Sequence, residues 1–445
     1  MMSDSADHPS QHNKQPSKAG FIRYRILLLV LWPALLLYTA FQAIRFGQWS
    51  YLLQRLGIYF NIAGPTEFWI HAASVGEVNA AAPLIHAIRK KHPNITVLLT
   101  TTTPTGAETA KRFIAKLDNP QSVVNCYLPL DYRLSVKRLL RRTSPRCLLV
   151  METEIWPNLF RCCHEQNVLL ITINGRLSQR TLHTAAWIKS LYRSTLHYSS
   201  LILTRSDHDS KNYIALGAAP QKVKTIGNIK FSARFNVPDK GNHPFNHRRY
   251  VLAASTHDNE EQLITQLWKQ HSGRFSDCLL VIAPRHPKRI ETILQQLKPA
   301  QLNIAVRSRN DSIDENTQIY IVDTLGELIQ FMVHADIVFM GGSLVPTGGH
   351  NILEPAVLSK AIVFGPYMHN FADEASQFLN HDSAVQVDSV SELGDVIGSL
   401  LEDERRRREL GANARAFIES QQDAADRYVA EIDKLLKNSE QSTDG

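Results

Sequence analysis

The sequence predicts two consecutive α/β domains, each built on a parallel sheet with helices on both faces. Short apolar runs rich in Val, Ile and Leu alternate with amphipathic stretches along most of the chain. Runs without polar alternation are typical of strands buried on both faces, and their alternation with helices is typical of doubly wound sheets. The 445 residues also exceed one compact core, because domains usually hold roughly 100–200 residues.

Two series of apolar runs place the domain boundaries. The first series lies at 68–70, 95–99, 123–128, 147–151 and 168–173, and the second at 250–254, 278–283, 319–322, 337–340 and 361–364. Between them, weak periodicity with Pro238, Gly241 and Pro244 indicates a linker. We therefore expect a first domain at 61–235, a linker at 236–249 and a second domain at 250–445, with a charged C-terminal helix in the second. Two such domains facing each other would form a cleft.

The N-terminal segment predicts a membrane anchor. Residues 1–20 are polar and are expected to be disordered, whereas 26–44 carry no charge between Arg25 and Arg45. That apolar stretch is long enough to cross a bilayer, which needs roughly 20 residues, and no signal-peptidase site follows it. A buried core helix and a helix lying in the membrane interface remain alternatives, because Pro33 weakens a long helix. We expect residues 21–60 to anchor the protein.

Composition limits the class of partner. The net charge of +7 favours an anionic partner such as a membrane surface, a nucleic acid or a phosphorylated substrate. The sequence has no RNA-recognition signature and no Cys/His zinc spacing, so we expect no nucleic acid partner. The five cysteines are sparse and lie mostly in or beside apolar runs, which indicates buried, reduced thiols.

Three acidic residues follow predicted strands of the first domain. Glu77 ends the segment 71–77, and Glu152 and Glu154 directly follow the run 147–151. Ligands of open α/β sheets bind outside the carboxyl ends of the strands, so each acid is a candidate for proton transfer or charge stabilisation. The alternatives are structural: Ser74 and Glu77 fit a capping box, and the other two acids could favour a helix dipole.

Two cationic segments are candidate phosphate contacts. Lys230 lies just before the linker, and a solvated lysine is its alternative interpretation. The segment 283–289 contains Pro284 and Arg285 among three fixed cations and an imidazole, after a strand and before a helix. Arginine binds phosphate oxygens bidentately, whereas the alternative is a basic surface turn.

A glycine-rich loop follows the fourth strand of the second domain. Segment 340–355 has two glycine pairs within about nine residues and then a helix start, where backbone N–H groups can bind an anion. Its alternative is helix capping by Asn351 and Glu354. The loop is neither a Walker loop nor a dinucleotide fingerprint. Asp207-His208-Asp209 has the form of a metal motif but lies far from this loop in sequence, and we expect no metal and no cofactor.

Seven segments, taken in order, resemble the Kdo transferases, which move 3-deoxy-D-manno-octulosonic acid (Kdo) from CMP-Kdo to a lipid A precursor. These segments are 71–77, 100–108, 152–158, 174–178, 227–231, 283–289 and 342–355. The resemblance implies a GT-B fold, an N-terminal membrane anchor and a catalytic face on the cytoplasmic side of the bacterial inner membrane. One departure is Ile352, where the family often has proline.

The resemblance also implies roles for individual residues in an inverting transfer of Kdo to lipid IVA, in lipopolysaccharide biosynthesis. Glu77 would be the catalytic base, and Glu152 and Lys230 would stabilise the transition state. The residues that would contact CMP are Pro284, Arg285, Leu325, Gly326, Glu327, Asn351, Ile352, Leu353 and Glu354. Fixed cations and the N–H groups of the glycine loop would then hold the leaving phosphate without a metal.

Two other functions fit parts of the same pattern. Another GT-B nucleotide-sugar enzyme, such as a lipid-linked glucosamine transferase or an epimerase, would share the fold, although an epimerase needs no anchor. An inactive membrane-tethered GT-B binding protein would also share it, but the acids Glu77 and Glu152 argue against that alternative.

Overall fold

The chain divides into two structural units. The structure is a computed structural model and describes residues 18–60, 62, 64–177, 179–232 and 241–441. Unit 1 comprises residues 1–233 together with 422–445, and unit 2 comprises residues 234–421. The expected disordered tail lies almost wholly outside the described residues, as does the first part of the expected linker.

Unit 1 contains a seven-stranded parallel sheet in the order β3-β2-β1-β4-β5-β6-β7. Its strands are β1 Phe68–His71, β2 Val97–Thr101, β3 Val123–Tyr127, β4 Cys147–Met151, β5 Leu169–Gly175, β6 Leu201–Thr204 and β7 Val223–Thr225. From β1 the chain winds first towards β3 and then returns to build β4 to β7 on the other side. The strand order therefore reverses between β1 and β4, and such a switch point is where open α/β sheets bind ligands.

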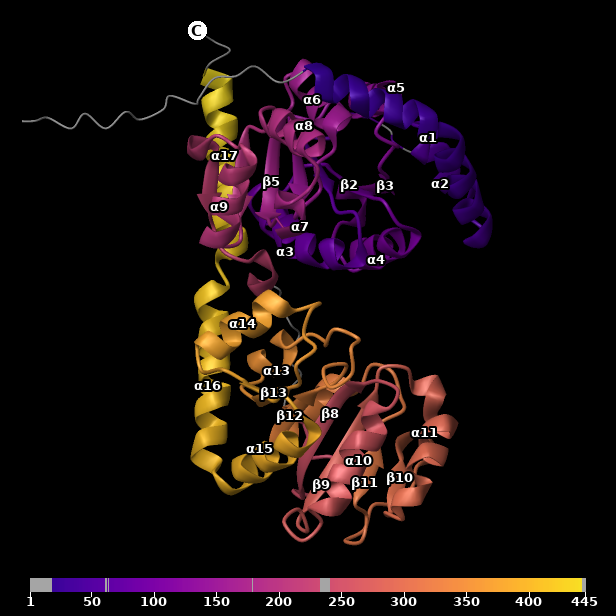
Figure 1. The fold of residues 1–445 in the computed structure, drawn as a ribbon, viewed down its shortest axis with the longest axis vertical. Coiled ribbons are helices and arrows are strands. Elements are labelled where there is room, and N and C mark those ends of the chain that lie inside the picture. Colours follow the sequence, from indigo (N-terminus) through magenta and orange to yellow (C-terminus); the bar gives the residue numbers. More distant parts are fainter. Residues whose placement is uncertain (1–17, 61, 63, 178, 233–240, 442–445) are drawn as a thin grey trace, which may run out of the picture. The chain divides into compact units, whose positions relative to one another are not determined.

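Helices cover both faces of this sheet (Figure 1). They are α1 Lys18–Arg45, α2 Trp49–Arg55, α3 Val75–Lys91, α4 Pro104–Ile114, α5 Arg133–Thr143, α6 Pro157–Glu165, α7 Gln179–Leu182, α8 Ala186–Leu196, α9 Asp207–Leu216 and α17 Ala424–Gln441, with short 3₁₀ turns η1 Pro120–Ser122, η2 Pro220–Lys222 and η3 Ile229–Ser232. Successive strand residues serve opposite cores: Phe68 and Ile70 pack with α3 and α17, whereas Trp69 packs with α5 and α6.

The last helix, α17, belongs to unit 1. From its position in the sequence, we expected it in the second domain. Its Tyr428 is fully buried in the core of unit 1, and the hydroxyl donates to Gly227 O at 2.9 Å. Asp433 of the same helix pairs with Lys91 at 2.6 Å. The expected C-terminal helix is in fact two helices, and only the first, α16 Glu404–Gln421, lies in unit 2.

Unit 2 contains a second seven-stranded parallel sheet, in the order β10-β11-β9-β8-β12-β13-β14. Its strands are β8 Arg249–Thr256, β9 Cys278–Pro284, β10 Ile304–Val306, β11 Ile319–Ile321, β12 Ile337–Met340, β13 Ala361–Phe364 and β14 Val385–Gln386. Its helices are α10 Glu260–Gln270, α11 Ile290–Leu297, α12 Leu328–His334, α13 Leu353–Val357, α14 Ala372–Asn380, α15 Val390–Glu402 and α16, with 3₁₀ turns η4 Pro287–Arg289, η5 Lys298–Ala300 and η6 Arg307–Arg309. Here the order reverses between β8 and β12.

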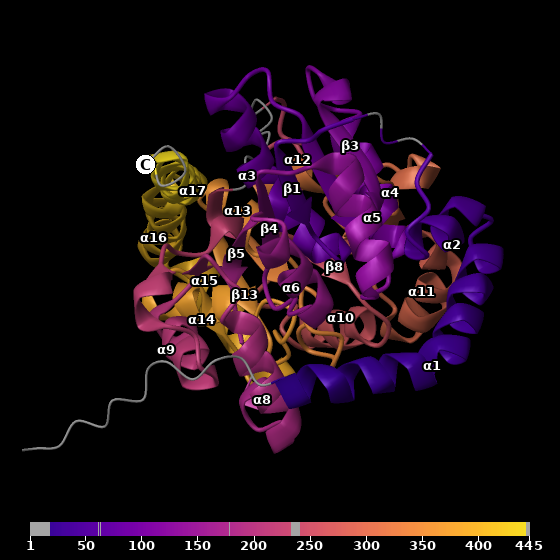
Figure 2. The same cartoon turned by 90° about the horizontal axis from the view of Figure 1, so that it is seen from above.

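Helix α1 runs across the surface of unit 1 and is long and apolar enough to cross a membrane (Figure 2). The helix continues through Pro33, which had argued against a long helix. Its residues alternate between two faces at helical spacing. Phe21, Thr39 and Ala43 are buried against unit 1, whereas Leu29 and Leu37 on the other face are more than two-thirds exposed.

Candidate active site and nucleotide-binding edge

The three acids singled out in the first domain gather at the switch point of unit 1. Glu77 lies in the first turn of α3, which follows β1, and the other two, Glu152 and Glu154, directly follow β4. Strands β1 and β4 are neighbours, with His71 paired to Val150 at their carboxyl ends. The negative charges of Glu154 and Glu152 both act on Glu77, so the three carboxylates form one electrostatic group.

Ser74 and Glu77 cap the start of α3 in a variant of the capping box, in which Glu77 reaches back to the residue before the N-cap Ser74. Glu77 Oε2 accepts from Ala73 N at 2.7 Å, and Ser74 Oγ accepts from Glu77 N at 3.4 Å. The structural interpretation of this motif is therefore confirmed. It does not exclude chemistry, because these contacts fix the carboxyl group in one orientation beside two other acids.

The environment of Glu77 favours its protonated form. Burial raises the pKa of Glu77 to about 8, and the charges of Glu154 and Glu152 add to the rise, while the Ala73 N–H and the Ser74 hydroxyl oppose it. At pH 7 most Glu77 carboxyls hold a proton, and the proton-accepting form increases as the pH passes about 8. A carboxyl group titrating near neutral pH is suited to general acid–base work.

Glu152 occupies a strained backbone position and is paired with Lys230. Its φ of +53° lies in the left-handed region, which is uncommon for a residue other than glycine. Two hydrogen bonds hold its backbone. Glu152 N donates to Ile173 O at 2.9 Å, and the Tyr213 hydroxyl donates to Glu152 O at 3.1 Å. Its Oε1 lies 3.4 Å from Lys230 Nζ, so the structure brings together two of the three predicted catalytic residues.

Glu154 has partners of its own. The Trp156 indole donates to Glu154 Oε2 at 2.7 Å, and the buried His71 Nε2 lies 3.8 Å from the same oxygen. Burial alone would raise the pKa of Glu154, but His71 and Trp156 outweigh it, so the pKa is below its ordinary value. The strand ends at Met151, so Glu152 and Glu154 both lie in the loop between β4 and α6.

The His71–Glu154 pair was not among the predicted catalytic residues. His71 is fully buried at the end of β1, and its Nδ1 lies 3.0 Å from Thr100 Oγ1. The sequence held one signal for this pair. His71 ends an apolar strand, and two acids directly follow the strand that lies beside it. The pairing itself depends on the parallel register of β1 and β4, which no local pattern reveals.

In unit 2, the predicted CMP-binding residues follow strands that end at one edge of the sheet. Pro284 closes β9, and Arg285 N donates to Thr256 O of β8 at 2.9 Å. The charge of Arg285 acts on both His350 and Glu354 in the loop after β12. Burial, His257 and Arg285 lower the pKa of His350 to about 4, so this imidazole is neutral at pH 7. The structure thus places Arg285 close to the segment Asn351–Glu354.

The start of the glycine loop binds an internal carboxylate. Glu260, fully buried in the first turn of α10, accepts from Gly342 N at 2.6 Å, Ser343 N at 3.2 Å and Leu344 N at 3.0 Å. A phosphate could use these three N–H groups only by displacing Glu260. The sequence predicted that this loop binds an anionic ligand, but at this end its N–H groups contact the protein's own Glu260, which the sequence had not indicated.

At the end of the loop the side chains of Asn351 and Glu354 contact each other, but they do not cap α13, whose N-cap residue is Ile352 without a side-chain cap hydrogen bond. Asn351 Oδ1 accepts from Leu353 N at 3.1 Å, and Asn351 Nδ2 donates to Glu354 Oε1 at 3.3 Å. Burial raises the pKa of Glu354, while Asn351 and Arg285 oppose the rise. Ile352 is fully buried and so serves the core through its side chain.

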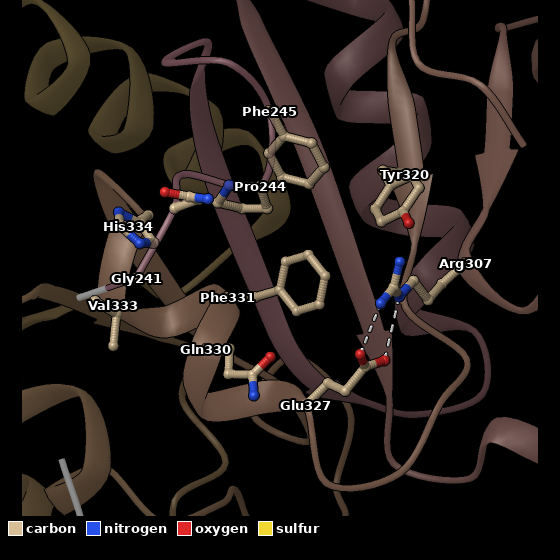
Figure 3. A pocket seen from close by; sticks show the side chains of 11 residues that line it. Gly241, Pro244, Phe245, Arg307, Tyr320, Glu327, Gln330, Phe331, Val333 and His334 are labelled. Atoms are coloured by element: carbon tan, nitrogen blue, oxygen red, sulfur yellow. Dashed lines mark hydrogen bonds and ion pairs between the residues drawn. The ribbon is translucent and has the colours of Figure 1, made fainter. Parts of the chain in front are cut away.

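The third predicted CMP segment lies after β11 and borders a pocket (Figure 3). Leu325 is 85% exposed, and Gly326 has a φ of +89° that only glycine adopts readily. Glu327 forms a two-bond pair with Arg307, and both line a pocket of about 440 Å³ whose walls include the rings of Tyr320 and Phe331. The Arg307 guanidinium holds the pKa of Glu327 below its usual range.

Within the described ranges, no group of three or more His, Cys, Asp or Glu side chains could hold a metal ion. Asp209 of the Asp-His-Asp motif is buried and accepts from Ser206 Oγ at 2.7 Å and Arg205 Nε at 3.1 Å. That carboxylate therefore has a structural role at the start of α9.

The architecture and these two sheet edges define the class. Two units, each with a parallel sheet wound in both directions from its first strand, form the GT-B fold of nucleotide-sugar enzymes. A putative UDP-N-acetylglucosamine 2-epimerase from Listeria monocytogenes shares this fold with a TM-score of 0.59, 13% identity, and coverage of 84% of this chain and 98% of that chain. At that identity the likeness concerns the fold alone.

The sequence comparisons identify the family. Residues 50–233 match the family described as 3-Deoxy-D-manno-octulosonic-acid transferase (kdotransferase). A 3-deoxy-D-manno-octulosonic acid transferase from Haemophilus influenzae is 32% identical over 400 residues, covering 87% of this chain and 92% of the relative. One from Rickettsia felis is 35% identical over 379 residues, covering 83% and 79% respectively. The chain belongs to this family of glycosyltransferases, as the seven segments predicted.

The coupling between the acids is directly testable. Glu154→Gln removes the like charge that acts most strongly on Glu77, so we expect the pKa of Glu77 to fall from about 8. The measurement is a carbon-detected NMR titration with labelled glutamate, with the Glu77 signal assigned through Glu77→Gln. Glu165→Gln, at the opposite end of α6 from Glu154, is the control and should change nothing. A Glu77 pKa near 4.5 in the unaltered protein would contradict this account.

Proposed function

We propose that this protein transfers Kdo from CMP-Kdo to lipid IVA, a lipid A precursor, with inversion at the anomeric carbon, during lipopolysaccharide biosynthesis. The observation that carries the proposal is the oriented Glu77 carboxyl group, whose pKa is raised to about 8 at the switch point of unit 1. Membership in the family supports Kdo as the transferred sugar.

Glu77 is the proposed catalytic base. In its ionised form it takes the proton from the acceptor's primary hydroxyl, whose oxygen bonds to the anomeric carbon as the bond to CMP breaks. Attack on the face opposite the leaving group gives inversion. Glu154 stays ionised beside His71 and keeps the local field negative, which raises the basicity of Glu77.

Glu152 and Lys230 are the proposed stabilising groups. Departure of CMP leaves oxocarbenium-like positive charge on the sugar ring beside a carboxylate. Glu152 and Lys230 lie 3.4 Å apart, and the backbone of Glu152 is held in a strained conformation. The pair therefore forms a preorganised dipole, and preorganised charge is usually the largest contribution to catalysis.

The nucleotide is proposed to bind at the carboxyl edge of the unit 2 sheet. Arg285 supplies a fixed cation for the phosphate, with Pro284 beside it, and the segment of Asn351, Ile352, Leu353 and Glu354 lies close to that cation. Leu325, Gly326 and Glu327 complete the proposed contacts from the loop after β11. Because Glu260 occupies the start of the glycine loop, we assign the phosphate to Arg285 and the later part of the loop.

Helix α1 is proposed to lie in the plane of the cytoplasmic leaflet of the inner membrane. Its inward face contacts unit 1 along the whole helix, from the buried Phe21 to the buried Ala43, and the Tyr132 hydroxyl donates to Leu28 O at 2.5 Å. A helix that spanned the bilayer would lose these contacts. The exposed apolar face, which includes Leu29 and Leu37, would instead enter one leaflet, as interfacial helices do.

Replacing the proposed base should abolish transfer without loss of the fold. Glu77→Gln keeps an oxygen acceptor for Ala73 N, so the cap of α3 remains, but it removes the proton acceptor. We expect the transfer rate to fall by about 10²–10⁴-fold while the Kd for CMP, measured by calorimetry, is unchanged. Glu108→Gln, an exposed acid on the neighbouring helix α4, is the matched control. Normal transfer by Glu77→Gln would overturn the assignment.

The in-plane orientation predicts that both ends of α1 lie on one side of the membrane. Arg23→Cys and Arg45→Cys place single reactive thiols near each end, because the five native cysteines are buried. We expect a membrane-impermeant maleimide to label both variants in inverted inner-membrane vesicles and neither in spheroplasts. Glu108→Cys in the catalytic part is the control for sidedness. Labelling of the two ends from opposite sides would show a spanning helix.

A further inference from the structure

Asp131 is a buried acid of unit 1 that the mechanism above does not use. It is 4% exposed and follows β3, yet its carboxylate contacts the start of α6. Oδ2 accepts from Asn158 N at 2.9 Å and Oδ1 accepts from Leu159 N at 2.8 Å. In return, Asn158 Nδ2 donates to Asp131 O at 2.6 Å, so each side chain binds the backbone of the other residue.

These contacts hold one end of the loop that carries two of the three clustered acids. Residues 152–156 form this loop, between the end of β4 and the start of α6. The β4 end of this loop is held through the backbone of Glu152, which contacts Ile173 O and the Tyr213 hydroxyl. The α6 end is held by Asp131. Glu154 and its partner Trp156 lie between the two attachments, so movement of the start of α6 would move both.

The third partner of this carboxylate comes from α1. The Tyr24 hydroxyl donates to Asp131 Oδ2 at 2.8 Å. Burial and the Asp131 charge raise the pKa of Tyr24, which keeps its hydroxyl protonated and available as a donor. Burial also raises the pKa of Asp131 to about 7, and the N–H group of Asn158, the Tyr24 hydroxyl and the N–H group of Leu159 oppose that rise. Tyr24 therefore contributes to keeping this carboxyl group in its charged form.

We propose that Asp131 is a positioning residue for the Glu152–Glu154 loop, and that Tyr24 makes helix α1 a structural support of the active site as well as a membrane anchor. Contacts run without a break from Tyr24 to Asp131, to the N–H groups of Asn158 and Leu159, and into the loop that presents Glu154 to His71. The expected change in kcat rests on the proposed function, whereas the expected displacement of the Glu152–Glu154 loop does not.

A simpler alternative is that Asp131 only stabilises α6 as a helix cap. Capping alone predicts a loss of thermal stability with no change at Trp156 or in turnover per folded molecule. Positioning predicts a change at the loop itself. The two are separated by measurements on folded protein that report the environment of Glu154, which the Trp156 indole contacts directly.

The test compares three conservative variants of the full chain. Tyr24→Phe removes the hydroxyl on Asp131, and Asp131→Asn places an amide donor against one of the two backbone donors of α6. Tyr132→Phe is the matched control, because it also removes a hydroxyl between α1 and unit 1 but leaves Asp131 intact. We expect Asp131→Asn to lower kcat by about 10–100-fold with KM for CMP-Kdo unchanged, since small displacements of catalytic groups cost this much.

Tyr24→Phe should give a smaller fall of the same kind, and Tyr132→Phe should leave kcat unchanged. In parallel, the indole N–H resonance of Trp156, assigned through Trp156→Phe, should shift in the first two variants and not in the third. An unchanged resonance and kcat in both Tyr24→Phe and Asp131→Asn would overturn the proposal. If the proposed transfer itself is wrong, the resonance still shifts while CMP-Kdo is not turned over in any variant.

Discussion

The crowding of three carboxylates at the switch point of unit 1 constrains the rest of this site. Like charges cannot all remain ionised in a half-buried place unless each has its own compensation. Glu154 has His71 and Trp156, and Glu152 has Lys230. Glu77 accepts from an N–H group and has a hydroxyl beside it, and its pKa rises. Unequal compensation therefore gives similar side chains different proton affinities, because the pKa of Glu154 falls and that of Glu77 rises.

Unit 2 also contains a buried acid whose charge is compensated, but there the compensating groups are backbone N–H groups. The N–H groups at the start of the glycine loop bind a carboxyl group of the protein, and burial raises the pKa of this group while these N–H groups oppose the rise. Glu260 supplies that carboxyl group, so the glycines there serve the packing of the loop against α10. Arg285, whose charge acts on the neutral imidazole of His350, is the cation to which the proposed function assigns the phosphate.

Much of this protein follows from local pattern. The apolar runs predicted the central strands of both sheets, and the order of the motifs predicted the family. Pairings between segments that are distant in the sequence could not be predicted from local pattern. Asp131 contacts the start of α6, Glu260 fills the loop after β12, and α17 returns to unit 1, each through contacts set by strand order. Ser74 and Glu77 cap the start of α3 as the sequence suggested, which shows that a capping role and a position beside the other acids are compatible.

The central claim is that this chain moves Kdo from CMP-Kdo to lipid IVA. The most direct measurement is transfer in vitro by the full-length protein in phospholipid vesicles, with the product masses determined by mass spectrometry. We expect the mass of lipid IVA to increase by one or more Kdo residues with CMP-Kdo as donor, and to stay unchanged with UDP-sugars. Turnover of UDP-sugars without any use of CMP-Kdo would contradict the account.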